Sequence, residues 1–246
     1  MVIFALKAKD IDMADKRDMP YIWATWLTKL LVGENSCEWA AWFRANHDSK
    51  SYSKVPSDFD ATEWQLRHTE LLNRVRIELE EDGKTVFTEN QNSFTLRGRT
   101  AILGGKPDLI TVSGGMGTVL DAKTGEPSTS HKVQVMLYMY ALPKALPQYR
   151  GITFEGKVVY PDHEESIPDT AIDDVFTDNL SNMIQRMASS DPARRVPSAL
   201  ECSFCNITSA DCSDSSRSEQ STEVILQKLH SRALGTLRAG SDEAIL

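Results

Sequence analysis

Two carboxylates and a lysine lie at the ends of two neighbouring apolar segments. Asp108 begins the segment 108–112, and Asp121 and Lys123 follow the segment 118–120. Mg²⁺ and Mn²⁺ are hard cations that prefer such oxygen ligands. A bound ion polarises a phosphoryl oxygen and lowers the pKa of an attacking water, while a nearby lysine can orient or deprotonate that water or neutralise charge. These residues therefore predict a metal-dependent phosphodiesterase, and a nuclease is the leading hypothesis.

The spacing also predicts how these side chains meet. Gly114 and Gly115 lie midway between the two β-rich segments, where a turn is expected. An antiparallel hairpin centred there puts Asp108 opposite Asp121, about 4.5–5.5 Å apart at Cα. Lys123 is two residues beyond Asp121, so both side chains leave the same face. A surface hairpin with solvated Asp and Lys is the alternative.

A predicted helix over 129–142, ending at Pro143, follows the hairpin. It carries Gln134 and Tyr138, which are one turn apart and hence on one face. Both can therefore face the same site. For Tyr138, a core aromatic is the alternative interpretation.

These segments resemble a known nuclease family. Gly-Lys-Pro-Asp at 105–108, Asp-Ala-Lys-Thr-Gly at 121–125 and Gln-Val-Met-Leu-Tyr at 134–138 are similar to motifs of the PD-(D/E)XK nuclease superfamily. The closest similarity is to the RecB-type branch, including the iron–sulfur nucleases of CRISPR adaptation and AddB-type nuclease domains. It covers about 37–212. The fold that it implies is α/β: a mixed central sheet flanked by helices, as in restriction endonucleases, with a helical lobe and a C-terminal iron–sulfur segment.

The resemblance also implies roles for individual residues. The catalytic set that it implies is Asp108, Asp121, Lys123, Gln134 and Tyr138. Asp108, Asp121 and the backbone carbonyl of Ala122 would bind Mg²⁺ or Mn²⁺. Lys123 would be the catalytic lysine, and the Gln and Tyr would face the substrate strand near the scissile phosphate.

The family further implies an upstream histidine or glutamate as a metal ligand. His68 is our choice, on a predicted helix over 61–82. Glu70 and Glu89 are the competitors. His131, at the start of the later helix, is expected to be a terminal or substrate-facing residue and not a catalytic one.

The four cysteines are unevenly distributed. Cys202, Cys205 and Cys212 cluster near the end, and Cys37 stands alone near the start. Four thiolates suit either Zn²⁺ or an iron–sulfur cluster, and unrelated thiols are a third alternative. In the resembling nucleases, one early and three late cysteines hold a [4Fe–4S] cluster. We expect such a cluster here in a structural role, with zinc as the alternative.

Composition limits the class of protein. The chain has 246 residues and a net charge of −8, which is unusual for a nucleic-acid binder but compatible with a nuclease whose carboxylates hold cations. We predict one nuclease domain over 19–212 and a polar, poorly ordered tail over 213–246. No apolar run is long enough to span a membrane and no signal peptide is evident, so a cytoplasmic protein is expected.

The elements expected to position these residues follow from periodicity and turn residues. They are two helices within 21–46, a helix over 61–82, strands within 85–123, a helix over 129–142, a strand over 152–160 and a helix over 169–189.

The predicted function is a Mg²⁺- or Mn²⁺-dependent deoxyribonuclease acting on single-stranded DNA or DNA ends, with an exonuclease favoured. The resemblance implies a role in CRISPR spacer acquisition or DNA repair, with an integrase or helicase as partner. One alternative is a DNA-end-binding subunit without catalysis. Another is a zinc-stapled endonuclease of the restriction type.

Overall fold

The computed structural model describes residues 14–56 and 61–215. Most of the predicted tail therefore lies outside the described residues, as does the start of the chain. None of the helices within the described ranges is long and apolar enough to cross a membrane.

The strands of the described ranges form two mixed sheets. The larger sheet has the order β2 (Val86–Thr88), β5 (Leu109–Ser113), β6 (Met116–Ala122), β7 (Thr153–Val159) and β8 (Glu164–Ile167). Its β6–β7 pair is parallel and its other pairs are antiparallel. The smaller sheet has the order β1 (Tyr21–Trp23), β4 (Ile102–Gly105) and β3 (Phe94–Arg97).

The α/β class is confirmed, but the strand block expected in one sheet is divided between two. Between β4 and β5 the chain passes through Lys106 and Pro107. A proline has no N–H to donate to a ladder, so it interrupts a sheet interior. The chain leaves the smaller sheet at this point and enters the larger one.

The helices fall close to the predicted positions. They are α1 (Ala24–Leu31), α2 (Glu38–Asn46), α3 (Ala61–Glu81), α4 (Glu89–Asn92), α5 (Thr129–Ala145), α6 (Asp174–Met187) and α7 (Ala199–Phe204), with 3₁₀ turns at Pro147–Tyr149 and Asp169–Ala171. The end of α3 is as predicted, because Gly83 takes φ +76°, a conformation suited to glycine after a helix.

Two helix boundaries differ from the prediction. Helix α5 contains Pro143 and continues to Ala145. Proline removes one hydrogen bond but does not end this helix, whose next residues still bury apolar surface. Helix α6 begins at Asp174, because the side chain of Asp173 accepts a bond from the N–H of Phe176 and caps it there.

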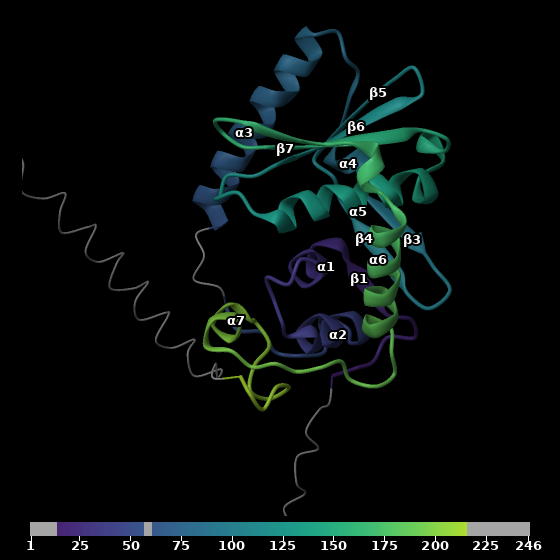
Figure 1. The fold of residues 1–246 in the computed structure, drawn as a ribbon. Helices are drawn as coiled ribbons and strands as arrows, with labels where there is room; N and C mark the ends of the chain where they lie inside the picture. Colours follow the sequence, from purple (N-terminus) through teal and green to yellow (C-terminus); the bar gives the residue numbers. More distant parts are fainter. Residues whose placement is uncertain (1–13, 57–60, 216–246) are drawn as a thin grey trace, which may run out of the picture.

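Helices cover both faces of the larger sheet (Figure 1). Helix α3 packs through Leu71 and Val75 against Leu120 and Ala122 of β6. Helix α5 covers the opposite face and also touches β3 and α1, so it lies between the larger sheet and the rest of the molecule.

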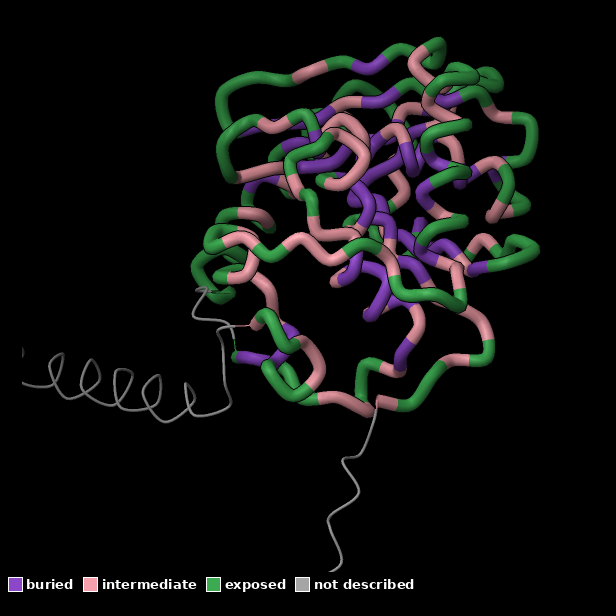
Figure 2. Tube along the Cα trace, turned by 60° about the horizontal axis from the view of Figure 1, so that its bottom comes forward, coloured by how far each residue is buried: buried purple, intermediate pink, exposed green. Residues whose placement is uncertain are grey.

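The buried segments run through the middle of the molecule, along α5 and the strands it covers (Figure 2). At Gly156 of β7 an added Cβ would lie 2.4 Å from Cγ1 of Val135 and 2.8 Å from Sδ of Met139. The close approach of α5 to the sheet therefore depends on this glycine. That contact sets the distance between α5 and the sheet. It therefore also sets how near the polar side chains of α5 come to the ends of β5 and β6.

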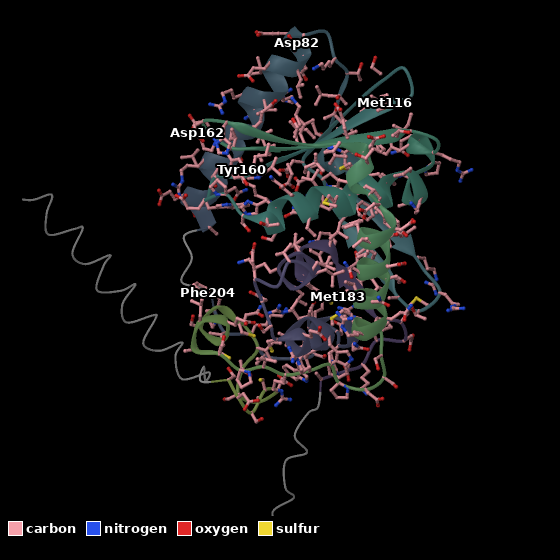
Figure 3. All side chains as sticks on the ribbon, viewed as in Figure 1. Asp82, Met116, Tyr160, Asp162, Met183 and Phe204 are labelled. Carbon is pink, nitrogen blue, oxygen red and sulfur yellow. The ribbon has the colours of Figure 1, made fainter. Side chains whose placement is uncertain are left out.

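In Figure 1, α1 lies beside the smaller sheet and α2 and α7 lie below it, and these three helices form a helical lobe. Phe204 marks α7 in this lobe, far from Asp82 and Met116 at the opposite end (Figure 3). The lobe joins residues from the start and the end of the described chain, because α2 packs against α6 and residues 54–55 bond to Asn206 and Ile207.

Candidate active site

The hairpin formed by β5 and β6 has the predicted register. Its ladder runs from Ser113↔Met116 to Leu109↔Leu120, and the turn is made by Gly114 and Gly115 at φ +58° and +86°. One step beyond the ladder the same register sets Asp108 opposite Asp121. Oδ2 of Asp108 accepts a 2.8 Å bond from the backbone N–H of Ala122, which holds the first carboxylate beside the second strand.

Asp121 is a buried carboxylate at the centre of a polar network. It is 1 % exposed, and its Oδ1 accepts a 2.9 Å bond from Nε2 of Gln134. Its Oδ2 lies 2.6 Å from Nζ of Lys123. Within the described chain, that same oxygen has no well-aligned hydrogen-bond donor.

The burial of Asp121 has an electrostatic consequence. Desolvation raises the pKa of Asp121 to about 6, and attraction by Lys123 opposes the rise. An anion held in this position needs compensating positive charge. Lys123 supplies part of it through the 2.6 Å contact with Oδ2.

Gln134 and Tyr138 continue the network into α5. Oε1 of Gln134 accepts a 3.0 Å bond from Nζ of Lys123, and Nε2 of Gln134 also donates to the Tyr138 hydroxyl over 3.1 Å. The glutamine thus contacts three partners at once. Its amide orientation is fixed, because Oε1 meets the ammonium and Nε2 meets the carboxylate.

Tyr138 is more deeply buried than expected for a residue that contacts the substrate strand. It is 2 % exposed and packs edge-on against Phe94, next to Gly105. Burial raises the pKa of Tyr138, so the hydroxyl keeps its proton. This burial favours the alternative interpretation, a core aromatic, whose hydroxyl contacts Gln134; direct contact of Tyr138 with the substrate strand stays a prediction.

His68 approaches the carboxylates from α3, on the other side of the sheet. Its Nε2 lies 3.5 Å from Oδ2 of Asp108, and the ring stacks on Trp64 with centroids 4.9 Å apart. The hydrogen bond with Asp108 raises the pKa of His68. Of its two competitors, Glu89 pairs with Lys106 at 2.7 Å and Glu70 is exposed.

His131 lies outside this network. Its Nδ1 is 3.0 Å from the hydroxyl of Tyr160, and burial lowers the pKa of the imidazole. Tyr160 directly follows β7 and is buried. This pairing orients the ring at the start of α5, and a non-catalytic role for His131 stays a prediction.

The donor set suits a hard divalent cation in its chemistry. Asp108 and Asp121 supply carboxylate oxygens, one of them poorly satisfied, and His68 supplies a ring nitrogen. Over the described ranges, no group of three or more His, Cys, Asp or Glu side chains is arranged to hold a metal as it stands. The ammonium of Lys123 compensates the charge of Asp121 in this arrangement.

The four cysteines line one cavity of about 360 Å³ in the helical lobe, although one of them is far from the other three in sequence. They are Cys37, Cys202, Cys205 and Cys212, all half-buried and none in a disulfide. Arg44 and Arg195 line the same cavity, and Nη2 of Arg44 is 3.8 Å from Sγ of Cys205. Burial raises the pKa of the Cys212 thiol, and the positive charge of Arg195 opposes this rise.

Two glutamates with long-range contacts were not predicted. Glu34 accepts bonds from Oγ of Ser128 at 2.7 Å and from the N–H of Ser130 at 3.2 Å, so it holds the start of α5. Glu201 bonds to the residues before α2. In the sequence Glu34 looks like a solvated turn residue. Glu201 follows Ser198 by three positions, as in an ordinary capping box.

The structure thus brings together a hairpin with two carboxylates, a lysine two residues after the second of them, and a helical glutamine. The sequence model of the PD-(D/E)XK nuclease superfamily matches residues 29–210, and the chain belongs to this superfamily. Membership indicates nuclease activity in general.

The other comparisons add little. Among curated proteins, no match is found. One solved structure with similarity is described as "Crystal structure of SSO0001", at 20% identity and a TM-score of 0.40, covering 77% of this chain and 84% of the other. A likeness this distant does not inform the function.

Proposed function

We propose that this chain is a Mg²⁺- or Mn²⁺-dependent deoxyribonuclease that hydrolyses phosphodiester bonds of single-stranded DNA or DNA ends. The observation that carries the proposal is the bonded set at the end of the hairpin. Asp121, Lys123 and Gln134 form a closed triangle of contacts at 2.6, 3.0 and 2.9 Å, with Asp108 opposite in the predicted register.

Four residues would hold the metal. They are His68, Asp108, Asp121 and, through its backbone carbonyl, Ala122. When bound, the ion supplies Lewis-acid polarisation of the scissile phosphate and makes water a better nucleophile at neutral pH. The buried Oδ2 of Asp121 supports this assignment, because apart from its ion pair with Lys123 it has no hydrogen-bond partner among the described residues.

Lys123 acts on the substrate side of the carboxylates. Its ammonium can stabilise negative charge that develops on the phosphate, or orient the attacking water. Gln134 holds this ammonium through Oε1 and holds Asp121 through Nε2, so it fixes the distance between the metal ligand and the lysine. Tyr138 in turn fixes the amide of Gln134.

The four cysteines are proposed to hold a [4Fe–4S] cluster, with Zn²⁺ as the alternative. Support comes from the shared cavity and from the one-early, three-late order of the cysteines. Metal ligands from both ends of the chain would link the N-terminal helices to the C-terminal segment across the nuclease core. The free energy of metal binding would then contribute to folding.

We further propose that the protein is an exonuclease. It would act in CRISPR spacer acquisition or DNA repair, with an integrase or helicase as partner. This proposal rests on the resemblance of the motifs to RecB-type iron–sulfur nucleases.

Digestion of matched linear and circular single-stranded DNA of one sequence tests this exonuclease assignment. We expect the linear form to be shortened from an end and the circle to persist. Cleavage of the circle at a similar rate would instead identify an endonuclease.

The replacement Gln134→Leu should lower kcat by roughly 10–100-fold, which is typical when a partner of a metal ligand is lost. The apolar side chain keeps the volume but releases both Lys123 and Asp121. Single-turnover cleavage at saturating Mn²⁺ measures the effect. Gln185→Leu, on the exposed face of α6, is the matched control and should cleave at the wild-type rate. Full activity in Gln134→Leu would remove this residue from the site.

A further inference from the structure

Glu201 occupies a position from which a glutamate ordinarily caps its own helix. It is the third residue of α7, and its N–H donates to Oγ of the N-cap residue Ser198 over 3.1 Å. A capping box would be completed by the glutamate side chain reaching back to the N-cap backbone. Instead, Oε1 accepts a 3.0 Å bond from the N–H of Ser36, and Oε2 accepts a 3.1 Å bond from the N–H of Cys37.

Cys37 is the N-cap residue of α2, and residues of the C-terminal segment bond to the N-terminal end of this helix. Among the described residues, the side chain of Cys37 makes no capping bond. The N–H of Trp39 donates to the carbonyl of Arg194 over 3.1 Å, and the guanidinium of Arg195 lies 4.4 Å from the Trp39 ring centroid. The start of α2 is therefore held by residues from the other end of the chain, without any contribution from a cysteine sulfur.

We propose that Glu201 is a positioning residue for the four-cysteine site, and that it holds Cys37 beside Cys202 before any metal binds. This inference rests on the cysteine site of the proposed function. Glu201 directly precedes Cys202 on α7, and its carboxylate accepts a hydrogen bond from the backbone of Cys37. One side chain therefore links the early cysteine to the late ones. Both bonds are charge-assisted, and such bonds are the stronger kind.

The consequence is a site organised in advance of its metal. A distant fourth ligand would otherwise have to be recruited from a free loop, with a cost in conformational entropy. With the backbone of Cys37 already held, less of the chain has to be ordered when the four sulfurs gather around a metal. Loss of Glu201 should therefore loosen Cys37 selectively and leave the other three cysteines in place.

The test compares the full-length wild type with Glu201→Ala, Glu201→Gln and Glu38→Ala. Glu38 is the matched control, because it is also a carboxylate at the start of α2 but pairs with Arg186, outside the cysteine cavity. Two rates are measured: metal loss to a chelator from the purified protein, and alkylation of each cysteine by iodoacetamide in reduced, metal-free protein, followed by mass spectrometry of peptides.

We expect Glu201→Ala to raise both the rate of metal loss and the alkylation rate of Cys37 by about tenfold, the scale of a lost hydrogen bond to a charged group. Cys202, Cys205 and Cys212 should react as in the wild type, whereas general unfolding would accelerate all four. Glu38→Ala should change neither rate. Glu201→Gln keeps one acceptor oxygen and the volume, so it should give a smaller increase and also carries the test if Glu201→Ala does not fold.

Unchanged alkylation of Cys37 in Glu201→Ala, or equal acceleration at all four cysteines, would overturn the proposal. The metal content of the wild type tests a different claim, namely that the cysteines bind a metal. A wild type that binds neither iron nor zinc when prepared without oxygen would remove the cysteine site from the proposed function. The selective reactivity of Cys37 would still decide whether Glu201 holds that residue.

Discussion

Asp121→Asn should reduce DNA cleavage by at least about a thousandfold, the upper scale for losing one charge-stabilising group in an active site. The amide keeps the shape of the side chain but removes the negative charge that the metal and Lys123 both need. The measurement is single-turnover cleavage in Mg²⁺ and in Mn²⁺. Retention of more than a small fraction of the wild-type rate would show that the metal is held elsewhere.

The same substitution should not destabilise the metal-free protein. Burial raises the pKa of Asp121 in the fold from 3.8 to about 6, so stability is lost as the pH rises through this window and the loss is complete above it. At pH 8 in EDTA, the substitution removes the free-energy cost of burying the charged carboxylate, but it also weakens the pairing with Lys123. We expect an unfolding temperature between the wild-type value and about 4 °C above it.

A control separates this effect from a general change in charge. Asp162→Asn removes an exposed carboxylate just beyond β7, where the side chain is 84% exposed and pairs with His163. It should leave cleavage unchanged. A fall of the Asp121→Asn unfolding temperature by more than about 4 °C in EDTA would mean that this carboxylate stabilises the fold instead of serving the chemistry.

Cys205→Ser should abolish the metal centre that we propose for the helical lobe and lower the stability of the whole protein. Three remaining thiolates bind iron–sulfur clusters or zinc much less well than four, and the binding free energy is also folding free energy. We expect loss of the brown colour, or of zinc, together with poorer solubility. Metal analysis and visible absorbance of protein prepared without oxygen measure the outcome.

Substitution of a second cysteine tests whether the early and late cysteines belong to one metal site. Cys37→Ser should reproduce the loss seen in Cys205→Ser despite its distance along the chain, because both residues line one cavity. Ser203→Ala, on the exposed side of α7, is the control and should retain the metal. Full metal content in Cys37→Ser would exclude a site shared by both ends of the chain.

The hairpin of the candidate site could be predicted from sequence because its determinants are local. Two glycines between β-rich segments fix the turn, and the period of two along a strand then fixes which side chains are opposed. For the same reason, the spacing of Gln134 and Tyr138 places them on one helix face. The depth of Tyr138 could not be obtained in this way, because it depends on how α5 packs on Gly105 and Phe94.

The unpredicted features are those that depend on contacts between distant segments. The carboxylates of Glu34 and Glu201 are satisfied by backbone groups far along the chain, and local sequence gives them ordinary roles in a turn and a cap. The division of the strands into two sheets likewise depends on where Pro107 breaks one ladder and on which strands then pair. Sequence periodicity identifies strands but not their partners.

The most direct test of the central claim is cleavage of end-labelled single-stranded DNA by the wild type in Mn²⁺, in Mg²⁺ and in EDTA, beside Asp121→Asn. We predict progressive shortening with either metal, none in EDTA and none with the variant. Shortening that persists in EDTA or in Asp121→Asn would contradict it, as would no cleavage by folded, metal-supplied wild type.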